Sequence, residues 1–336
     1  MENKIIFSSA VSSAEKKAVT DFVDEWKSDG ATISIFTSGS TGSPKKIEIE
    51  KSAMVASAIA TGTFFKFEKK HKVLLCLSAN YIAGMMQIVR AIVFEMSLHV
   101  VPVSSNPLRA FNEEIDFAAF VPLQVKAILA DEMTKERYEN IKHVIIGGAP
   151  ISTDLFADIC HLKNKSFATF GMTETVSHIA LKHISTENDF YQALPDISFG
   201  QSNNDTLIIY AKRIAKDPIC TNDVVALKNS SSFQWLGRAD FVINSGGVKL
   251  HPEVIEAKLA KAIEEPFYIT KMQDDTLGEK VILVIESEPY LPVKRQKIEA
   301  MMREILLNYE MPKSIVFQNE FQRSNSGKII RERLIQ

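Results

Sequence analysis

The sequence predicts a large α/β domain followed by a smaller α+β domain. The chain has 336 residues, which is enough for about two domains. From about residue 72 to residue 160, strand-like apolar runs alternate with helix-like segments, as in a parallel sheet covered by helices. After about Asp240 this alternation stops, and a helix, a strand and a second helix follow. We therefore expect an N-terminal domain at 1–239 and a C-terminal domain at 240–336.

The elements of the first domain follow from residue periodicity and from breaking residues. Val19, Phe22, Val23 and Trp26 recur at helical spacing, and Gly30 ends that segment. Strands are predicted at 31–36, 45–50, 72–78 and 98–103, and at 143–150 a strand ends in a glycine turn. Helices are predicted at 52–65, with Ser52 as the cap, and at 82–94, 123–133 and 153–160.

The second domain is predicted from a shorter set of elements. A helix at 252–263 begins with Pro252 in its first turn, where the missing N–H is tolerated. A strand at 280–287 and an amphipathic helix at 293–308 follow, and the chain ends in a basic, polar tail at 322–336.

Charge and cysteine content exclude several classes of function. The chain carries 39 basic and 41 acidic residues, so no overall field favours nucleic acid or an anionic membrane. Cys76, Cys160 and Cys220 lie far apart, without the spacing of a metal site or a disulfide framework. The N-terminus holds only a short apolar run, and longer apolar runs are interrupted by charges. We expect a cytoplasmic protein without a signal peptide or a membrane segment.

The stretch TSGSTGSPKK, from Thr37 to Lys46, has the composition of an anion-binding loop. Its glycines let backbone N–H groups approach an anion, and its hydroxyls can donate hydrogen bonds to phosphate oxygens. Lys45 adds a positive charge. Pro44 stands where a Walker A loop needs glycine, so the loop is of another kind. A solvated hairpin loop would have a similar composition, and the stretch alone leaves both interpretations open.

Four further stretches favour a nucleotide site. They are FGMTET at 170–175, CTND at 220–223, LGRADFVINSGGVKLHPEVIE at 236–256 and NSGKIIR at 325–331. Together with the loop, and in this order, they resemble the adenylate-forming superfamily of acyl- and aryl-CoA ligases, luciferases and peptide-synthetase adenylation domains. The resemblance runs from about Ile33 to the end of the chain. It implies a large N-terminal adenylation domain and a small mobile C-terminal domain, with ATP and Mg²⁺ as cofactors.

The resemblance assigns roles to the motif residues. The phosphate loop holds the β- and γ-phosphates of ATP and comprises Thr37, Ser38, Gly39, Ser40, Thr41, Gly42 and Lys45. Phe170, followed by Gly171, matches an aromatic that packs on adenine, Thr173 a contact of the α-phosphate and Glu174 a ligand of Mg²⁺. Gly147, Gly148 and Ala149 match a turn that lines the acyl pocket and the adenine. Asp223 and Arg238 match the two ribose contacts, although Asn222 replaces the usual glycine before the aspartate.

Three further assignments concern the C-terminal domain. Asp240 matches the hinge on which that domain swings. Lys328 matches the lysine of the first transition state, where a cation relieves the repulsion between an attacking carboxylate and the α-phosphate. Gly246 and Gly247 match a turn that leaves room for the pantetheine arm of coenzyme A. A plain β-turn would also tolerate two glycines, and both interpretations can hold at once.

The acid is indicated by the stretch SANYIAGMMQIVRAIV at 78–93. It resembles the corresponding part of o-succinylbenzoate–CoA ligases of menaquinone biosynthesis, in which His-x-x-Gly precedes an arginine that meets the second carboxylate of the substrate. Here Tyr81 replaces the histidine, while Gly84 and Arg90 match. An arginine in an otherwise apolar helix is costly to bury without an anion, but it can also lie at a helix edge. Tyr81 leaves open altered gating of the pocket or a different acid.

The expected function is therefore that of an ATP-dependent acid–CoA ligase, with o-succinylbenzoate as the first candidate substrate. Only about 35 residues precede the phosphate loop, which favours a small aromatic or dicarboxylic acid unless a homodimer supplies the missing wall. One alternative is a ligase that acts on another small acid or loads a carrier protein. The other is a non-catalytic nucleotide-binding regulator, against which the retention of Lys328, Glu174 and Asp223 argues.

Overall fold

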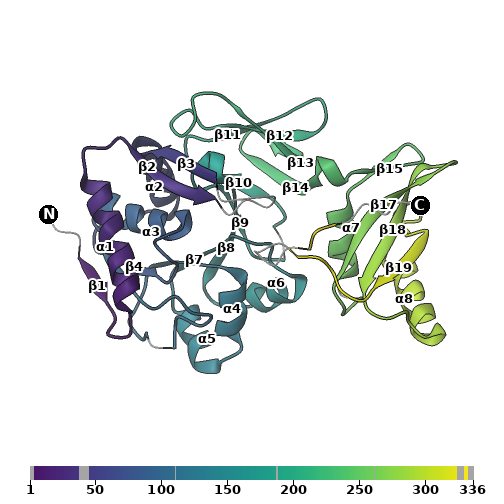
Figure 1. The fold of residues 1–336 in the computed structure, drawn as a ribbon, viewed down its shortest axis with the longest axis horizontal. Helices are drawn as coiled ribbons and strands as arrows, with labels where there is room; N and C mark the ends of the chain where they lie inside the picture. Colours follow the sequence, from purple (N-terminus) through teal and green to yellow (C-terminus); the bar gives the residue numbers. More distant parts are fainter. Residues whose placement is uncertain are drawn as a thin grey trace. The chain divides into compact units, whose positions relative to one another are not determined.

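The chain forms two compact units (Figure 1). The structure is a computed structural model that describes residues 4–37, 45–109, 111–186, 188–260, 262–323 and 329–331. The first unit comprises Met1–Gly200, Ile208–Ile219 and Leu227–Gln234, and the second comprises Gln201–Leu207, Cys220–Ala226 and Trp235–Gln336. The predicted boundary between 239 and 240 stays a prediction. Among the described residues, no helix combines the length and the apolar character that crossing a membrane requires.

The first part of the large sheet is parallel, as predicted. Its strands, in spatial order, are β1 (Ile5–Phe7), β5 (Ser97–Val100), β4 (Lys72–Leu75), β6 (Phe117–Phe120), β7 (His143–Ile146) and β8 (Lys165–Gly171). In the four central strands, β5, β4, β6 and β7, at least three of the four residues are buried, which is typical of parallel sheets with both faces covered.

The sheet continues in a way that the sequence did not indicate. The order after β8 is β9 (His178–His183), β10 (Tyr191–Ala193), β14 (Ser232–Arg238), β13 (Ile219–Asn229), β12 (Thr206–Tyr210) and β11 (Ser198–Gln201). β9 runs antiparallel to both β8 and β10. The parallel arrangement therefore holds for the first six strands of the order only.

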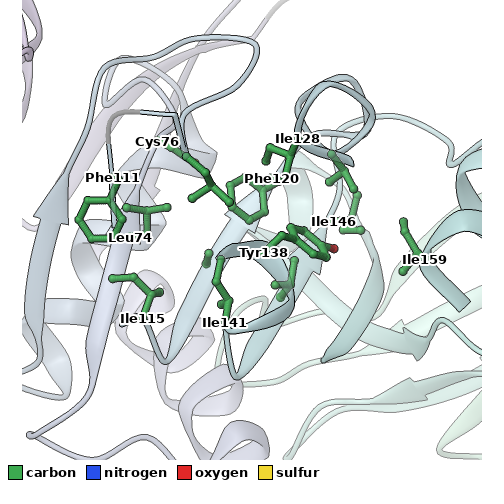
Figure 2. Close-up of a cluster of buried hydrophobic side chains, with 14 of the residues drawn as sticks. Leu74, Cys76, Phe111, Ile115, Phe120, Ile128, Tyr138, Ile141, Ile146 and Ile159 are labelled. Atoms are coloured by element: carbon green, nitrogen blue, oxygen red, sulfur yellow. The ribbon is translucent and has the colours of Figure 1, made fainter. Parts of the chain in front are cut away.

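Helices cover both faces of the parallel strands. They are α1 (Ser13–Lys27), α2 (Lys51–Phe65), α3 (Ile82–Val93), α4 (Pro122–Leu129), α5 (Glu132–Glu139) and α6 (Thr153–Cys160). Because side chains alternate along a strand, successive residues of β6 point to opposite faces of the sheet. Phe117 contacts Phe65 of α2, while Phe120 belongs to a core with α4, α5 and α6 (Figure 2). Tyr138 of α5 is fully buried in this core, with its hydroxyl 2.9 Å from Ser166 Oγ.

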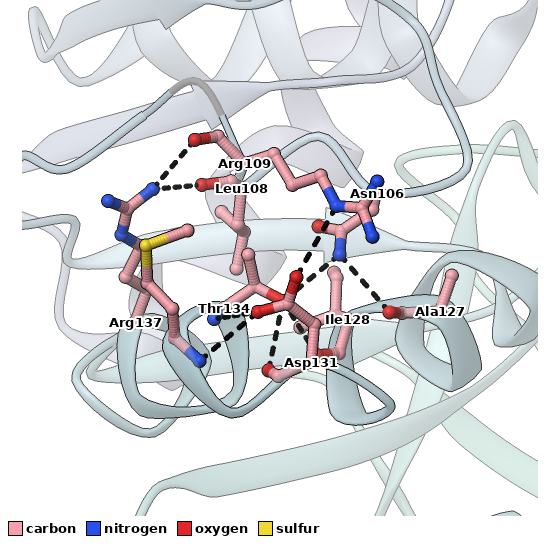
Figure 3. Close-up of polar contacts among 9 residues, drawn as sticks. Asn106, Leu108, Arg109, Ala127, Ile128, Asp131, Thr134 and Arg137 are labelled. Atoms are coloured by element: carbon pink, nitrogen blue, oxygen red, sulfur yellow. Dashed lines mark hydrogen bonds and ion pairs between the residues drawn. The ribbon is translucent and has the colours of Figure 1, made fainter.

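Two predicted helices differ in detail from the observed ones. α2 begins at Lys51 with Glu50 as its cap residue, so Ser52 lies inside the helix and is not its cap. The predicted helix at 123–133 is split into α4 and α5 (Figure 3). Asp131 Oδ1 accepts hydrogen bonds from the N–H groups of Met133 and Thr134, which starts a new helix.

The second unit has its own α+β core. The small sheet has the order β16 (Val248–Leu250), β15 (Ile243–Ser245), β18 (Gly278–Glu286) and β17 (Phe267–Asp274), and β19 (Ser314–Gln318) pairs in parallel with β18. The helices are α7 (Pro252–Leu259) and α8 (Pro292–Ile305). α7 starts at the predicted proline but ends four residues earlier than predicted. Ile255, Leu283 and Met302 are among the buried residues that join helices and sheet.

Candidate active site

The two strands on either side of the predicted phosphate loop pair with each other. β2 (Thr32–Thr37) and β3 (Lys45–Glu50) pair antiparallel in a two-stranded sheet, with Thr37 opposite Lys45. The two predicted strands are therefore confirmed. Ser38, Gly39, Ser40, Thr41 and Gly42 lie outside the described residues, as do the side chains of Thr37 and Lys45. Their binding of phosphate stays a prediction.

Two predicted motifs meet at the carboxyl edge of the parallel strands. β7 and β8 are neighbours, so the turn at Gly147–Ala149 and the stretch at Phe170–Glu174 leave the sheet at the same edge. Ligands of α/β sheets bind at this edge. A Cβ on Gly147 would lie only 2.2 Å from Thr169 Oγ1, so glycine is needed for close packing there. Gly148 has φ +83°, a conformation that also favours glycine.

Phe170 belongs to an aromatic cluster at this edge. Its half-buried ring lies 5.6 Å from Tyr191 and 5.1 Å from Phe233, measured between ring centroids. A Cβ on Gly171 would lie 2.5 Å from the Ser177 carbonyl oxygen, so this glycine allows two backbone segments to touch. The cluster fixes the plane of Phe170 while part of its side chain stays exposed.

A strained turn follows at Val176. Thr173–Thr175 form a short 3₁₀ helix, in which Thr173 is half-buried and Glu174 is exposed. Val176 has φ 64° and ψ −53°, and the Ser177 N–H donates to the Thr175 carbonyl over 2.6 Å. These values describe a γ-turn with positive φ, a rare and strained conformation for a β-branched residue. Such strain costs about 1–3 kcal/mol and is found mainly at functional sites.

Glu174 fits a metal that arrives with a nucleotide. Its carboxylate forms no hydrogen bond or ion pair with any residue that the structure describes. The described residues also contain no group of three His, Cys, Asp or Glu side chains able to hold a metal. Mg²⁺ is commonly bound by one or two carboxylates together with substrate phosphates, and a single exposed carboxylate suits that mode.

Arg90 is buried, and no acidic residue among those described pairs with it. Its side chain, in the middle of α3, is only 2% exposed. Nη1 donates to Gln87 Oε1 over 3.3 Å, and Nη2 donates to Ser177 Oγ over 2.8 Å. Within the part of the chain that the structure describes, Nε has no hydrogen-bond partner and no carboxylate forms an ion pair with the guanidinium. Burial lowers the pKa of Arg90 to about 9, because charge is disfavoured away from water.

His178 lies beside Arg90 as a neutral ring. The Thr61 hydroxyl donates to the Ser57 carbonyl over 3.1 Å, so its oxygen accepts from His178 Nε2, 3.2 Å away. The lone pair of His178 Nδ1 then faces Arg90 Nη2 at 3.5 Å. Burial, and next the positive charge of Arg90, lower the pKa of His178 well below its usual value. Sequence reasoning missed His178, because no motif includes it.

The remaining residues of the predicted acid site have separate surroundings. Tyr81, at the start of α3, is 63% exposed and makes only backbone hydrogen bonds within the described residues. A Cβ on Gly84 would lie 2.2 Å from the Ser78 carbonyl oxygen, so helix packing alone requires glycine there. Two pockets of about 290 and 360 Å³ occur in the first unit, and neither is lined by a predicted site residue.

The predicted ribose carboxylate, Asp223, belongs to the second unit. It is buried, and its Oδ1 accepts a hydrogen bond of 2.9 Å from the Trp235 indole. Its N–H donates to Thr221 Oγ1, which in turn donates to the Leu207 carbonyl. Trp235 therefore orients the carboxylate, and the role of Asp223 as a ribose contact stays a prediction. Sequence reasoning missed Trp235, although it stands three residues before Arg238.

Arg238 and Asp240 form an exposed ion pair. Arg238 Nη2 lies 3.3 Å from Asp240 Oδ2, and both side chains are about half exposed. Such a pair contributes little to stability, so either group can exchange its partner for a ligand. The roles of Arg238 as a ribose contact and of Asp240 as a hinge stay predictions.

Gly246 and Gly247 form the tight turn between β15 and β16. Ser245 pairs with Val248, which leaves a two-residue loop, and the two glycines have φ of 58° and 83°. Positive φ at both central positions defines a type I′ turn. The turn thus explains both glycines, and their predicted role toward pantetheine stays a prediction. Lys328 lies outside the described residues.

Comparison with known proteins identifies the family of this chain. A model of the AMP-binding enzyme family matches residues 3–200. The chain belongs to the AMP-binding enzyme family. This confirms the resemblance inferred from the motifs. The AMP-binding enzyme described here is 24% identical to the 2-succinylbenzoate–CoA ligase of Geobacillus sp. (strain WCH70), over 92% of this chain and 69% of that protein.

Solved structures support the same fold for this AMP-binding enzyme. An acyl-CoA synthetase (AMP-forming)/AMP-acid ligase II-like protein from Dyadobacter fermentans is 33% identical, with a TM-score of 0.68, over 96% of this chain and 94% of that one. The o-succinylbenzoate coenzyme A synthetase of Bacillus subtilis, in complex with ATP and magnesium, has a TM-score of 0.73 at 19% identity. That alignment covers 88% of this chain and 68% of the Bacillus protein.

Proposed function

We propose that this enzyme is an acid–CoA ligase that acts on o-succinylbenzoate in menaquinone biosynthesis. In the first step a carboxylate oxygen of the acid attacks the α-phosphorus of ATP, and pyrophosphate leaves. In the second step the thiol of coenzyme A attacks the acyl carbon, and AMP leaves. The family, and the names of the similar ligases from Geobacillus and Bacillus subtilis, support this reaction.

The nucleotide contacts that we propose are the ones that the family resemblance assigns. Thr173 meets the α-phosphate, Phe170 packs on adenine, and Asp223 with Arg238 holds the ribose. Glu174 holds Mg²⁺, which supplies charge neutralisation at the phosphates. Lys328 stabilises the charge that develops when two anions approach each other. The exposed carboxylate of Glu174 supports these assignments, as does the Asp223 carboxylate that Trp235 orients through Oδ1.

The observation that carries the choice of acid is the burial of Arg90. A buried cation is stabilised when an anion accompanies it, and the described residues supply only the neutral partners Gln87, Ser177 and His178. The second carboxylate of a dicarboxylic substrate would supply the missing charge. A monocarboxylic acid would leave the positive charge of Arg90 without an anion, so we expect the enzyme to prefer the dicarboxylate.

Pyrophosphate release with ATP, Mg²⁺ and matched acids tests the proposal. The acids are o-succinylbenzoate and two analogues that keep one carboxylate each, 3-benzoylpropionate and 2-butyrylbenzoate. We expect release with o-succinylbenzoate, with a free CoA thioester as the product. Release without a CoA thioester would favour a carrier protein as the acceptor, and release with another acid only would discard the pathway.

An Arg90→Met variant tests the acid site itself. A charge-assisted hydrogen bond contributes roughly 1.5–3 kcal/mol, so KM for o-succinylbenzoate should rise about 10- to 100-fold. KM for the better monocarboxylic analogue should hardly change. Arg109→Met, which replaces an exposed arginine, is the control. An equal rise of KM for both acids would show that Arg90 does not bind the second carboxylate. If the wild type binds ATP but releases no pyrophosphate with any acid, the result would favour the alternative of a non-catalytic nucleotide-binding regulator.

A further inference from the structure

The described end of the tail, Arg331, is held by a buried charge cluster of the second unit. Arg331 Nη2 lies 2.8 Å from Glu256 Oε2 and 3.6 Å from Glu253 Oε1. The guanidinium also stacks over the Phe241 ring, 4.6 Å from its centroid. The side chains of Arg331, Glu253 and Glu256 are only 16%, 12% and 20% exposed. Buried pairs of this kind are costly to break, because one charge is then left unpaired.

The cluster contacts the residues around the predicted hinge. Glu253 lies against Gly237, where φ is +146° and a Cβ would come within 2.2 Å of Glu253 Oε2. Phe241, under the guanidinium, is the residue after Asp240. Glu256 Oε1 accepts a hydrogen bond of 2.7 Å from the Ile269 N–H of β17. The cluster therefore joins Arg331 to α7, to β17 and to residues 237–241 around the predicted hinge, which we call the hinge segment.

The cluster holds two carboxylates but one guanidinium. Burial raises the pKa of Glu253, and it raises the pKa of Glu256 to about 7. Glu253 Oε2 has no hydrogen-bond partner among the described residues. The positive charge of Arg331, and to a smaller extent that of Arg238, acts against the effect of burial on the pKa of Glu253. Without Arg331 the two carboxylates would face each other with less compensation, and the segment that carries Arg331 would lose its attachment.

The chain is also fixed before the tail. Arg323 Nη1 and Nη2 both donate to the Glu286 carboxylate, over 2.7 and 2.5 Å. Arg323 forms an isolated bridge with Ile329, and the Ile330 N–H donates to the Gln322 carbonyl over 2.8 Å. The described residues on both sides of 324–328 are therefore attached to the second unit, by Glu286 on one side and by the cluster on the other.

We propose that Arg331 is a positioning residue for Lys328, and that the Glu253–Arg331–Glu256 cluster ties the chain that follows this lysine to the hinge segment. The proposal rests on the role given to Lys328 in the proposed function. A lysine that stabilises a transition state must be held in one position relative to the reacting atoms. A side chain on a loosely attached segment reaches that position less often, so the reaction is slower. Arg331 stands three residues after Lys328. Among the described residues of the tail, it forms the most buried ion pair, with Glu256.

Separate assays of the two half-reactions test this role. In Arg331→Gln, kcat for pyrophosphate release should fall about 10- to 100-fold, since misplaced catalytic groups lose rate of this order, while KM for ATP and for the acid hardly changes. Thioester formation from supplied acyl-adenylate and coenzyme A should stay within about twofold, because that step does not use Lys328. Arg331→Lys should recover part of the rate. Arg303→Gln, an exposed arginine of α8, is the control.

Loss of both half-reactions to the same extent in Arg331→Gln would show a general structural role and overturn the proposal. Glu256→Gln guards against simple misfolding, since its amide can still accept from the Ile269 N–H. It should show the same selective loss to a smaller degree. Unchanged pyrophosphate release in both variants would also overturn the proposal.

Hydrogen exchange at the Ile329 and Ile330 amides separates this proposal from the proposed function. We expect the two amides to exchange faster in Arg331→Gln than in the wild type, whether or not any acid is activated. If the wild type releases no pyrophosphate but the two proteins still differ in exchange, the proposed reaction is wrong and the attachment of the tail by Arg331 is supported. Equal exchange in the two proteins would show that Arg331 does not hold the tail.

Discussion

Arg90 is a residue whose removal should separate stability from function. Replacing an unneutralised buried cation with an apolar side chain of similar length is often neutral or stabilising. We therefore expect Arg90→Met to unfold in urea with a free energy equal to that of the wild type or higher by about 1–2 kcal/mol. The variant should lose the extra stability that o-succinylbenzoate gives the wild type. A loss of about 3 kcal/mol without ligand would instead show that Gln87, Ser177 and His178 satisfy Arg90 structurally.

His178 should make the first unit sensitive to acid. Its pKa is lowered in the fold, so the unfolded chain binds the proton more readily below the ordinary value near 6.5. Its contribution to stability is fully present above pH 6.5 and is lost as the pH falls, by at most about 1.4 kcal/mol per pH unit.

Denaturation of the His178→Gln variant between pH 7 and pH 5 measures this contribution. The variant should show a smaller loss of stability over this range than the wild type. His161→Gln, at an exposed histidine after α6, should keep the wild-type slope. Equal slopes in the wild type and in His178→Gln would mean that the ring can take up a proton in the fold.

At the scale of elements, the turn between β15 and β16 offers a test of the pantetheine assignment. Asparagine tolerates positive φ, and a Cβ at position 247 would meet no atom within 4 Å. Gly247→Asn should therefore change the free energy of unfolding by less than about 1 kcal/mol. If the turn lines the thiol channel, the thioester half-reaction should slow at least about tenfold while adenylation continues, because a misplaced reactant loses rate of this order.

Gly278→Asn is the matched control for this turn. Gly278 also has positive φ, at 76°, and begins β18 in the same sheet, where a Cβ would make an ordinary contact of 3.7 Å. We expect this variant to keep both half-reactions. Equal thioester rates in the wild type and in Gly247→Asn would leave the turn with a structural role only.

The elements that could be predicted are those with uninterrupted patterns. The apolar runs at 72–75 and 143–146 and the helix at 82–93 carry their own periodicity, and each was found where it was expected. The strands from β9 to β14 were not predicted, because β10 and β11 are short and the longer β13 mixes polar with apolar residues. The helix at 123–133 divides because the Asp131 carboxylate competes for backbone N–H groups, which apolar periodicity does not reveal.

Candidate residues within motifs could be named, but their partners could not. Phe170, Glu174 and Asp223 follow from short motifs that can be recognised along the chain. His178 is 88 residues from Arg90 along the chain, so their contact depends on how α3 packs against β9. The strained turn at Val176 likewise follows from packing, since its residue types indicate no turn.

At the scale of the whole molecule, the proposed binding of Mg²⁺ by the exposed Glu174 together with the phosphates of ATP means that the metal arrives with the nucleotide. A chelator should therefore leave the melting temperature of the protein without nucleotide unchanged. With ATP at about 100 times its Kd, the wild type should gain roughly 2.7 kcal/mol, and the chelator should remove most of this gain. Pyrophosphate release should cease at the same time.

Melting curves with and without chelator and ATP, recorded beside a pyrophosphate assay, check these expectations. Glu174→Gln should keep the melting temperature of the wild type without nucleotide but should gain less from ATP with Mg²⁺. A lower melting temperature in chelator alone would reveal a structural metal and would contradict the proposed mode of binding.

The contact between Trp235 and Asp223 also gives the protein an optical probe of its own. The chain has two tryptophans, and Trp26 lies in α1 beside Phe22. In a Trp26→Phe variant the remaining indole donates its N–H to the carboxylate assigned to the ribose. Indole fluorescence responds to the charge and hydration near the ring. Emission recorded while nucleoside, AMP or ATP is added would therefore report the occupation of that carboxylate in real time, without any label.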